Sequence, residues 1–165
     1  MEKDFVVSGS LSAGLLVLMM VSIPHSVAQR ASPPTEAVTL DYQFFKTRVE
    51  PIFKKKRPGH ARCFLCHLDE TGAQAKNSAF RLEKIPPGST FWTEEQSRRN
   101  FDVVSALVTP SEPQASRLLI HPLAAAAGGD LYHPGGRQFA SQDDPDWQTI
   151  AEWVRGQKAD SSSDK

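Results

Sequence analysis

Five consecutive residues, Cys63-Phe64-Leu65-Cys66-His67, combine two thiols and one imidazole at a spacing that suits covalent chemistry. The two cysteines are three positions apart, so in a helix both sulfurs face the same side. A Cys-x-x-Cys-His run is the attachment signature of a c-type haem, whose iron takes the histidine as an axial ligand. The motif therefore predicts one covalent haem c, with Cys63 and Cys66 as thioether donors and His67 as the proximal ligand.

The amino-acid composition offers no other role for the two cysteines. The chain has 165 residues and only these two cysteines, so a disulfide framework elsewhere is excluded. Nineteen basic side chains balance 19 acidic ones, and the formal net charge is zero. A chain of this length and charge predicts one domain, with no attraction for nucleic acid and no requirement for membrane association.

The N-terminal residues 1–28 have the pattern of a secretory signal peptide. Lys3 precedes an apolar stretch from Leu11 to Ile23, and Ser26-Val27-Ala28 matches a small-residue cleavage site. This pattern predicts a periplasmic or secreted protein, or an N-terminal membrane anchor if the segment is not cleaved. Export supports the haem prediction, because bacterial c-type haem is attached outside the cytoplasm.

Apolar spacing and helix caps predict an all-α domain around the motif. A helix beginning near Asp41 carries an apolar stripe, which Pro51 should kink or end. A short helix is expected within 78–85. Another helix follows the capping box of Thr93 and Gln96, and a closing helix runs from Asp144 towards Gly156. The domain boundaries expected are a flexible lead-in at 29–40, a haem domain at 41–156 and a disordered tail at 157–165.

The second axial ligand is expected to be a histidine. All three methionines, at positions 1, 19 and 20, belong to the predicted signal peptide. His60 is too close to the motif to reach the opposite face of the haem. His133 is favoured because it lies in a glycine-rich segment, 128–136, about a dozen residues before the closing helix. His121 is the alternative distal ligand.

A basic segment surrounds the motif, and we call it the basic collar. Its cations lie between positions 46 and 62, and such runs are usually solvated surface. Two functions are open: pairing with haem propionates, and docking of an acidic redox donor or acceptor. The collar consists of Lys46, Arg48, Lys54, Lys55, Lys56, Arg57, His60 and Arg62.

Several stretches together resemble a known family. They are the run from Phe44 through Val49-Glu50-Pro51-Ile52-Phe53 to the Cys-x-x-Cys-His motif, then Ser116-Arg117-Leu118-Leu119, Gly128-Gly129-Asp130, His133-x-Gly135-Gly136 and Asp146-Trp147 with Trp153-Val154. The chain is similar over residues 41–156 to cytochrome c domains in exported proteins of acidobacteria and planctomycetes. The resemblance implies a class-I-like, mostly helical cytochrome c domain that carries electrons and is not an enzyme.

Three other interpretations of the motif differ in chemistry. His60, Cys63, Cys66 and His67 could form a zinc site, although they lie closer together than paired finger ligands. A thioredoxin-type dithiol would need a strand leading into the motif and a βαβ frame. A haem with an open distal position would instead suit a sensor of a gas or peroxide, or a peroxidase-like protein.

Overall fold

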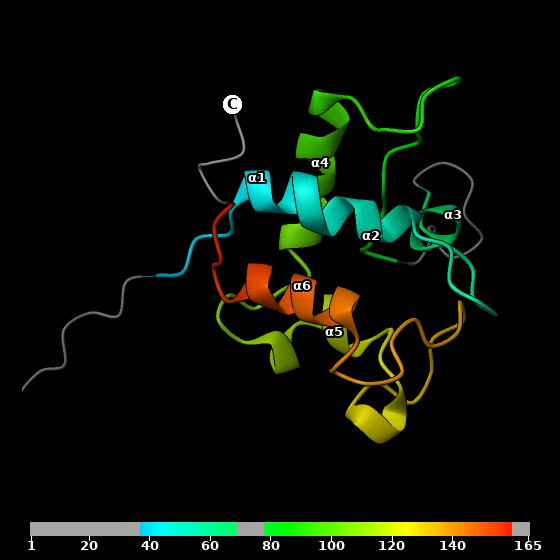
Figure 1. Cartoon of the computed structure of the whole chain (residues 1–165), viewed down its shortest axis with the longest axis vertical. Helices are drawn as coiled ribbons and strands as arrows, with labels where there is room; N and C mark the ends of the chain where they lie inside the picture. The colour runs from blue at the N-terminus through cyan, green and yellow to red at the C-terminus, as the bar shows by residue number, and fades with distance from the viewer. Residues whose placement is uncertain (1–36, 69–77, 160–165) are drawn as a thin grey trace, which may run out of the picture. The chain divides into compact units, whose positions relative to one another are not determined.

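The computed structural model describes residues 37–68 and 78–159, and this part of the chain is all-α (Figure 1). The chain divides into two units, residues 1–35 and 36–165, and every described residue belongs to the second. Within the described residues, β-structure is limited to two isolated bridges. No helix among them is long and apolar enough to cross a membrane. The predicted signal peptide and residues 29–36, 69–77 and 160–165 lie outside the described residues.

The first helical stretch begins where the sequence predicts but does not end at Pro51. Asp41 caps it by accepting a hydrogen bond from the Phe44 N–H at 2.7 Å. The stretch consists of α1 (Tyr42–Phe44), a π-helical segment η1 (Phe45–Val49) and α2 (Glu50–Lys54). Pro51 lies in the first turn of α2, directly after the wider π turn, where its missing N–H is tolerated. The expected kink is therefore a change of helix type within a continuous stretch.

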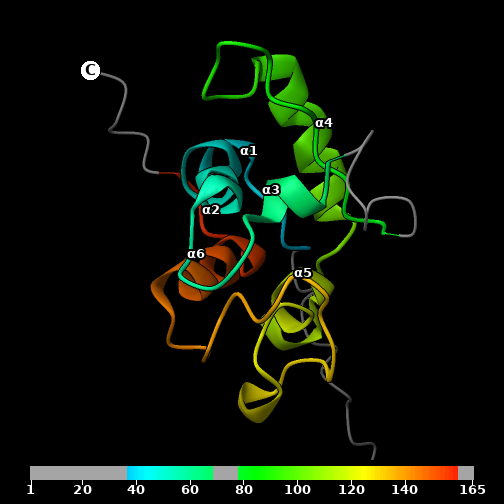
Figure 2. The same ribbon diagram turned by 90° about the vertical axis from the view of Figure 1, so that its right-hand side faces the viewer.

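The closing helix α6 (Pro145–Val154) lies beside this first stretch and runs in the opposite direction (Figures 1 and 2). The Trp153 indole N–H donates to the Asp41 carbonyl at 2.9 Å, while Lys55 pairs with Asp146 at the other end. The Asp144 side chain caps α6, as predicted, by accepting from the Asp146 N–H at 2.9 Å. Two antiparallel helices thus bring the ends of the described chain together.

The helix α4 (Glu94–Ser105) crosses this pair (Figure 2). The predicted capping box is formed, with Thr93 Oγ1 bound by the Gln96 N–H and Gln96 Oε1 bound by the Thr93 N–H. Shorter helices complete the fold: α3 (Cys63–Cys66), η3 (Pro113–Ala115), α5 (Arg117–Ile120) and η4 (Ala125–Ala127). Residues 128–136 form turns without helix or strand, as their glycine content predicts.

The short helix expected within 78–85 is absent, and this segment is extended instead. Leu82 forms an isolated parallel bridge with Leu68, and its N–H donates to the His67 carbonyl at 2.7 Å. Leu82 is fully buried in this conformation. The burial of its side chain and the bond to His67 are tertiary contacts, which outweigh a weak local helix preference.

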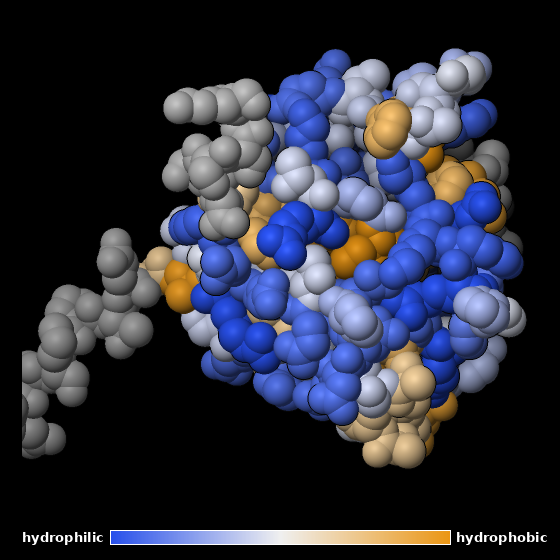
Figure 3. Space-filling view, in the orientation of Figure 1, coloured by the Kyte–Doolittle hydropathy of each residue, from blue (hydrophilic) through white to orange (hydrophobic). Residues whose placement is uncertain are grey.

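The hydrophobic core lies where the helical stretches meet. Phe45 contacts the rings of Phe53, Phe101 and Trp153, with ring centres between 5.4 and 6.3 Å apart. The stripes predicted for the first and closing helices are buried here, except for the partly buried Tyr42. The face drawn in Figure 3 is mostly hydrophilic, in keeping with this burial. Fully buried large side chains include Trp147, Trp153, Phe44, Phe45, Phe53, Leu82, Leu119 and Leu123.

Candidate functional site

One cavity of about 390 Å³ opens beside the Cys-x-x-Cys-His motif. Its size is within the range of about 300–1,000 Å³ for cofactor sites. Cys63, Cys66 and His67 line it from α3, and His121 and His133 line it from the later loops. Every residue proposed from sequence as a thioether donor or iron ligand therefore faces one cavity. Its apolar wall comes from α2, α5, α6, the turn after α4 and the loop before α6: Ile52, Phe53, Leu118, Ile150, Leu107 and Phe139.

His67 is oriented by a backbone carbonyl. Its Nδ1 lies 2.9 Å from the Phe80 carbonyl oxygen, which can only accept, so Nδ1 carries the proton. The neutral ring then has its lone pair on Nε2, the atom left to bind a metal. Burial lowers the pKa of His67, which keeps this metal-binding neutral form at pH 7.

His133 faces His67 with the same arrangement. Its Nδ1 donates to the Gly136 carbonyl at 2.6 Å, and burial likewise lowers its pKa. Gly136 has a φ of 80°, a left-handed value that suits glycine, in the turn that brings its carbonyl back to His133. The ring centres of His67 and His133 are 6.4 Å apart. Two imidazoles that bind one metal ion from opposite sides at about 2 Å would have ring centres roughly 6 Å apart, close to this distance.

His121 lies next to His133. The two rings meet edge to face with centres 4.9 Å apart, and His121 Nδ1 lies 2.6 Å from Asp130 Oδ2. Among the described residues, His67 forms a ring contact with His133 but none with His121. The structure thus brings both predicted distal candidates to the cavity and places His133 in contact with His67.

His60, the other histidine within the described residues, does not line the cavity. Its Nδ1 is buried without a hydrogen-bond partner, and a Cβ added at Gly136 would approach it to 2.5 Å. His60 thus packs against Gly136, in the turn that begins at His133. No group of three or more His, Cys, Asp or Glu side chains in the described ranges is arranged to hold a metal ion alone. The arrangement gives no support to a zinc site built from His60, Cys63, Cys66 and His67.

The two cysteines form no disulfide, and their environment does not suit a redox dithiol. Burial raises the pKa of Cys63 to about 11, so this thiol stays protonated in the folded chain. Catalytic cysteines of the thioredoxin type need the opposite, a lowered pKa that stabilises the thiolate. Within the described residues, no strand leads into the motif, because α2 and a turn precede α3.

Three groups at the cavity were not foreseen from the sequence. The Phe80 carbonyl is a backbone atom and carries no sequence signal. Arg117 lines the cavity together with Arg62, and within the described ranges neither guanidinium has an ion-pair partner. Gln138 also lines it and joins two walls, because its Nε2 donates to the carbonyls of Ala61 and Gly135.

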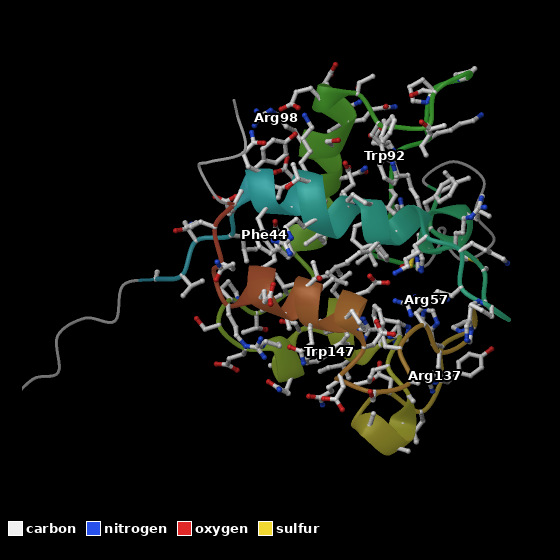
Figure 4. The ribbon with its side chains drawn as sticks, in the orientation of Figure 1. Phe44, Arg57, Trp92, Arg98, Arg137 and Trp147 are labelled. Carbon is white, nitrogen blue, oxygen red and sulfur yellow. The ribbon has the colours of Figure 1, made fainter. Side chains whose placement is uncertain are left out.

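Three members of the basic collar form ion pairs within the described part of the chain. Arg57 binds Asp144 and Asp146 at the start of α6, between α2 and the loop before α6 (Figure 4). Lys46 pairs with Glu94, and Lys55 pairs with Asp146. Lys54 and Lys56 donate to backbone carbonyls instead. These pairs lower the net positive charge of the collar, and docking there stays a prediction.

No family model, curated protein or solved structure matches this chain. The chemical interpretation therefore depends on the residues and their arrangement.

Proposed function

We propose that this chain is an exported c-type cytochrome that transfers electrons through one covalently attached haem c. The observation that carries the proposal is the convergence of Cys63, Cys66, His67 and His133 on one cavity. The 6.4 Å between the two imidazole ring centres leaves the space that one metal ion bound to both nitrogens needs.

The donor set of the cavity fits a haem. The sulfurs of Cys63 and Cys66 would hold the porphyrin, and the Nε2 atoms of His67 and His133 would bind the iron from its two sides. A porphyrin supplies the other four iron ligands, so two imidazoles suffice. Arg62 and Arg117 add positive charge, which the propionate groups of a haem would balance. The apolar wall suits a flat aromatic ring.

Electron transfer is the chemistry that the haem supplies when bound. The chain keeps both histidines neutral by burial and fixes each Nδ1 on a carbonyl, so neither ring needs to turn between redox states. Two imidazole ligands favour a lower reduction potential than a His and Met pair does. We infer no catalytic residue, because Asp130, an acid beside the histidines, is bound to His121.

A pyridine haemochrome assay tests the proposal. The full chain is produced in a host with c-type haem maturation machinery, and the haem is extracted with acidified acetone. We expect covalent haem in the wild type and none in the Cys63→Ser/Cys66→Ser variant. A purified wild-type protein without haem would overturn the proposal, and bound zinc in its place would favour the zinc site.

An open distal position is the second candidate, and it would make the protein a sensor or a peroxidase-like protein. His133 faces His67 across the cavity, which favours the six-coordinate form. The absorption spectrum of the oxidised holoprotein separates the two: we expect a low-spin spectrum that does not change when cyanide or peroxide is added at low concentration. A high-spin spectrum with rapid ligand binding would favour the open site.

A further inference from the structure

A buried polar group joins α2 to α4. Ser97 Oγ donates to Glu50 Oε2 at 2.8 Å, and Asn100 Nδ2 donates to Glu50 Oε1 at 3.0 Å. Glu50 is 5% exposed, Ser97 1% and Asn100 0%. Burying a carboxyl and an amide costs free energy that apolar side chains at these positions would avoid. Apolar packing therefore does not explain why these three polar side chains are buried here.

Asn100 uses its other polar atom to hold the extended segment 80–84. Its Oδ1 accepts a hydrogen bond from the Glu83 N–H at 2.9 Å. The indole N–H of Trp92 donates to the Glu83 carbonyl at 2.6 Å. Both backbone groups of Glu83 are therefore bound by side chains, because this segment has no helix or sheet to satisfy them.

The same segment orients His67. The Leu82 N–H donates to the His67 carbonyl at 2.7 Å, and the Phe80 carbonyl accepts from His67 Nδ1 at 2.9 Å. Only two residues separate Phe80 from Glu83. A displacement at Glu83 therefore moves the carbonyl that fixes the His67 ring.

We propose that Asn100, held by Glu50, is a positioning residue for the proximal histidine His67. The inference rests on the proposed function, since it concerns His67 as a haem ligand. A carbonyl that accepts from Nδ1 fixes the ring and raises the electron-donating strength of Nε2. Stronger donation stabilises ferric iron, so loss of this hydrogen bond raises the reduction potential.

Two variants weaken the segment from different sides. Asn100→Leu removes the acceptor for the Glu83 N–H, and Trp92→Phe removes the donor to the Glu83 carbonyl while keeping an aromatic ring against Phe64. A rescue variant, Glu50→Gln with Asn100→Asp, keeps an oxygen acceptor for Glu83. In it the Gln amide donates to the Asp carboxylate, so the hydrogen-bond count is preserved.

The measurements are the hydrogen exchange rate of the His67 Nδ1–H, by NMR of the holoprotein, and the reduction potential. We expect exchange about tenfold faster in Asn100→Leu and Trp92→Phe, with a positive shift in potential, and wild-type values in the rescue variant. Trp153→Phe is the control, because it removes a buried hydrogen bond to the Asp41 carbonyl, away from this segment. It should lower the melting temperature and leave both readouts unchanged.

The possible results distinguish a failure of the positioning role from a failure of the proposed function. Unchanged exchange and potential in Asn100→Leu and Trp92→Phe, on a haem-loaded protein, would overturn the positioning role and leave the proposed function intact. If the Asn100→Leu protein does not fold in usable amounts, the exchange rate and the potential of Trp92→Phe test the positioning role. A wild-type protein without haem would overturn the proposed function and this inference together.

Discussion

At the scale of single residues, the site depends on which nitrogen of each imidazole carries the proton. His67 and His133 both donate from Nδ1 to backbone carbonyls, at 2.9 and 2.6 Å. His121 instead donates from Nδ1 to the carboxylate of Asp130. A backbone carbonyl fixes a ring without adding charge, whereas a carboxylate adds a negative charge beside the site. Either kind of acceptor orients a metal-ligating histidine, so the preference for His133 over His121 rests on its ring contact with His67.

Replacing His133 by Ala is expected to abolish the six-coordinate low-spin spectrum of the oxidised haem protein. Replacing His121 by Ala should leave a low-spin spectrum, because His133 stays in place. His121 is close enough to substitute, with ring centres 4.9 Å apart, so the double variant is measured as well. If His121→Ala loses the low-spin spectrum and His133→Ala keeps it, His121 is the distal ligand.

Glu50 makes stability depend on pH in a defined direction. Burial raises its pKa despite the hydrogen bonds from Asn100 and Ser97. The folded chain therefore binds the proton more tightly than the unfolded chain, whose carboxyl titrates near pH 4.5. This contribution is complete below that pH and is lost as the pH rises through the folded pKa.

Glu50→Gln removes this titration. We expect the free energy of unfolding of the wild type, measured in urea between pH 4 and pH 8, to fall relative to that of the variant as the pH rises. If the difference in unfolding free energy between wild type and variant stays constant across this range, the Glu50 carboxyl has the same pKa in the folded and unfolded chain. That result would contradict the prediction.

At the scale of elements, α6 is fixed at its first turn by Arg57. The guanidinium pairs with Asp144 and Asp146 and lies over the Phe139 ring at 4.9 Å. Burial alone would raise the pKa of Asp144, but hydrogen bonds from Arg57 and from the Asp146 N–H lower it below its usual value. The ion pairs therefore stabilise the fold at neutral pH, and this stability is lost as the pH falls through the lowered pKa.

Arg57→Ala is expected to lower the free energy of unfolding by about 1–3 kcal/mol, between the values for surface and buried ion pairs. Lys46→Ala is the matched control, because its pair with Glu94 is more exposed and should contribute less than the Arg57 pairs. Urea denaturation at pH 7 measures both. Equal effects would show that the Arg57 ion pairs are no stronger than a surface pair.

At the scale of the whole molecule, part of the positive charge near the site is balanced within the chain. The formal net charge of the chain is zero, and acids of α4 and α6 neutralise part of the basic collar. Long-range attraction of an acidic redox protein would therefore come from the collar cations that form no ion pair within the described chain. Lys56 is one of these, because it is exposed and donates only to the His60 carbonyl among the described residues.

Lys56→Glu tests docking at the collar. We expect slower oxidation of the reduced protein by ferricyanide, an anionic oxidant, at low ionic strength, with the effect disappearing at about 1 M salt. Lys158→Glu makes the same change in net charge at another exposed lysine that donates to a backbone carbonyl, that of Thr39. Equal slowing by both variants in stopped-flow measurements would exclude the collar as the docking surface.

Features that depend on neighbouring residues could be predicted from the amino-acid sequence. The caps at Asp41, Thr93 and Asp144 form as predicted, because a side-chain oxygen reaches N–H groups two or three residues along the same chain. The spacing of Cys63, Cys66 and His67 likewise follows from one helical turn. The glycine content of 128–136 excluded regular structure there, whatever the rest of the chain does.

Features that depend on residues distant in the chain emerged only when the helices were packed together. Tertiary packing made the segment 78–85 extended rather than helical, because Leu82 is buried and bound to His67. It placed His133, rather than His121, in ring contact with His67. It also paired the collar with acids far away in the chain. No spacing rule encodes these contacts, because each depends on how helices that are distant in sequence pack together.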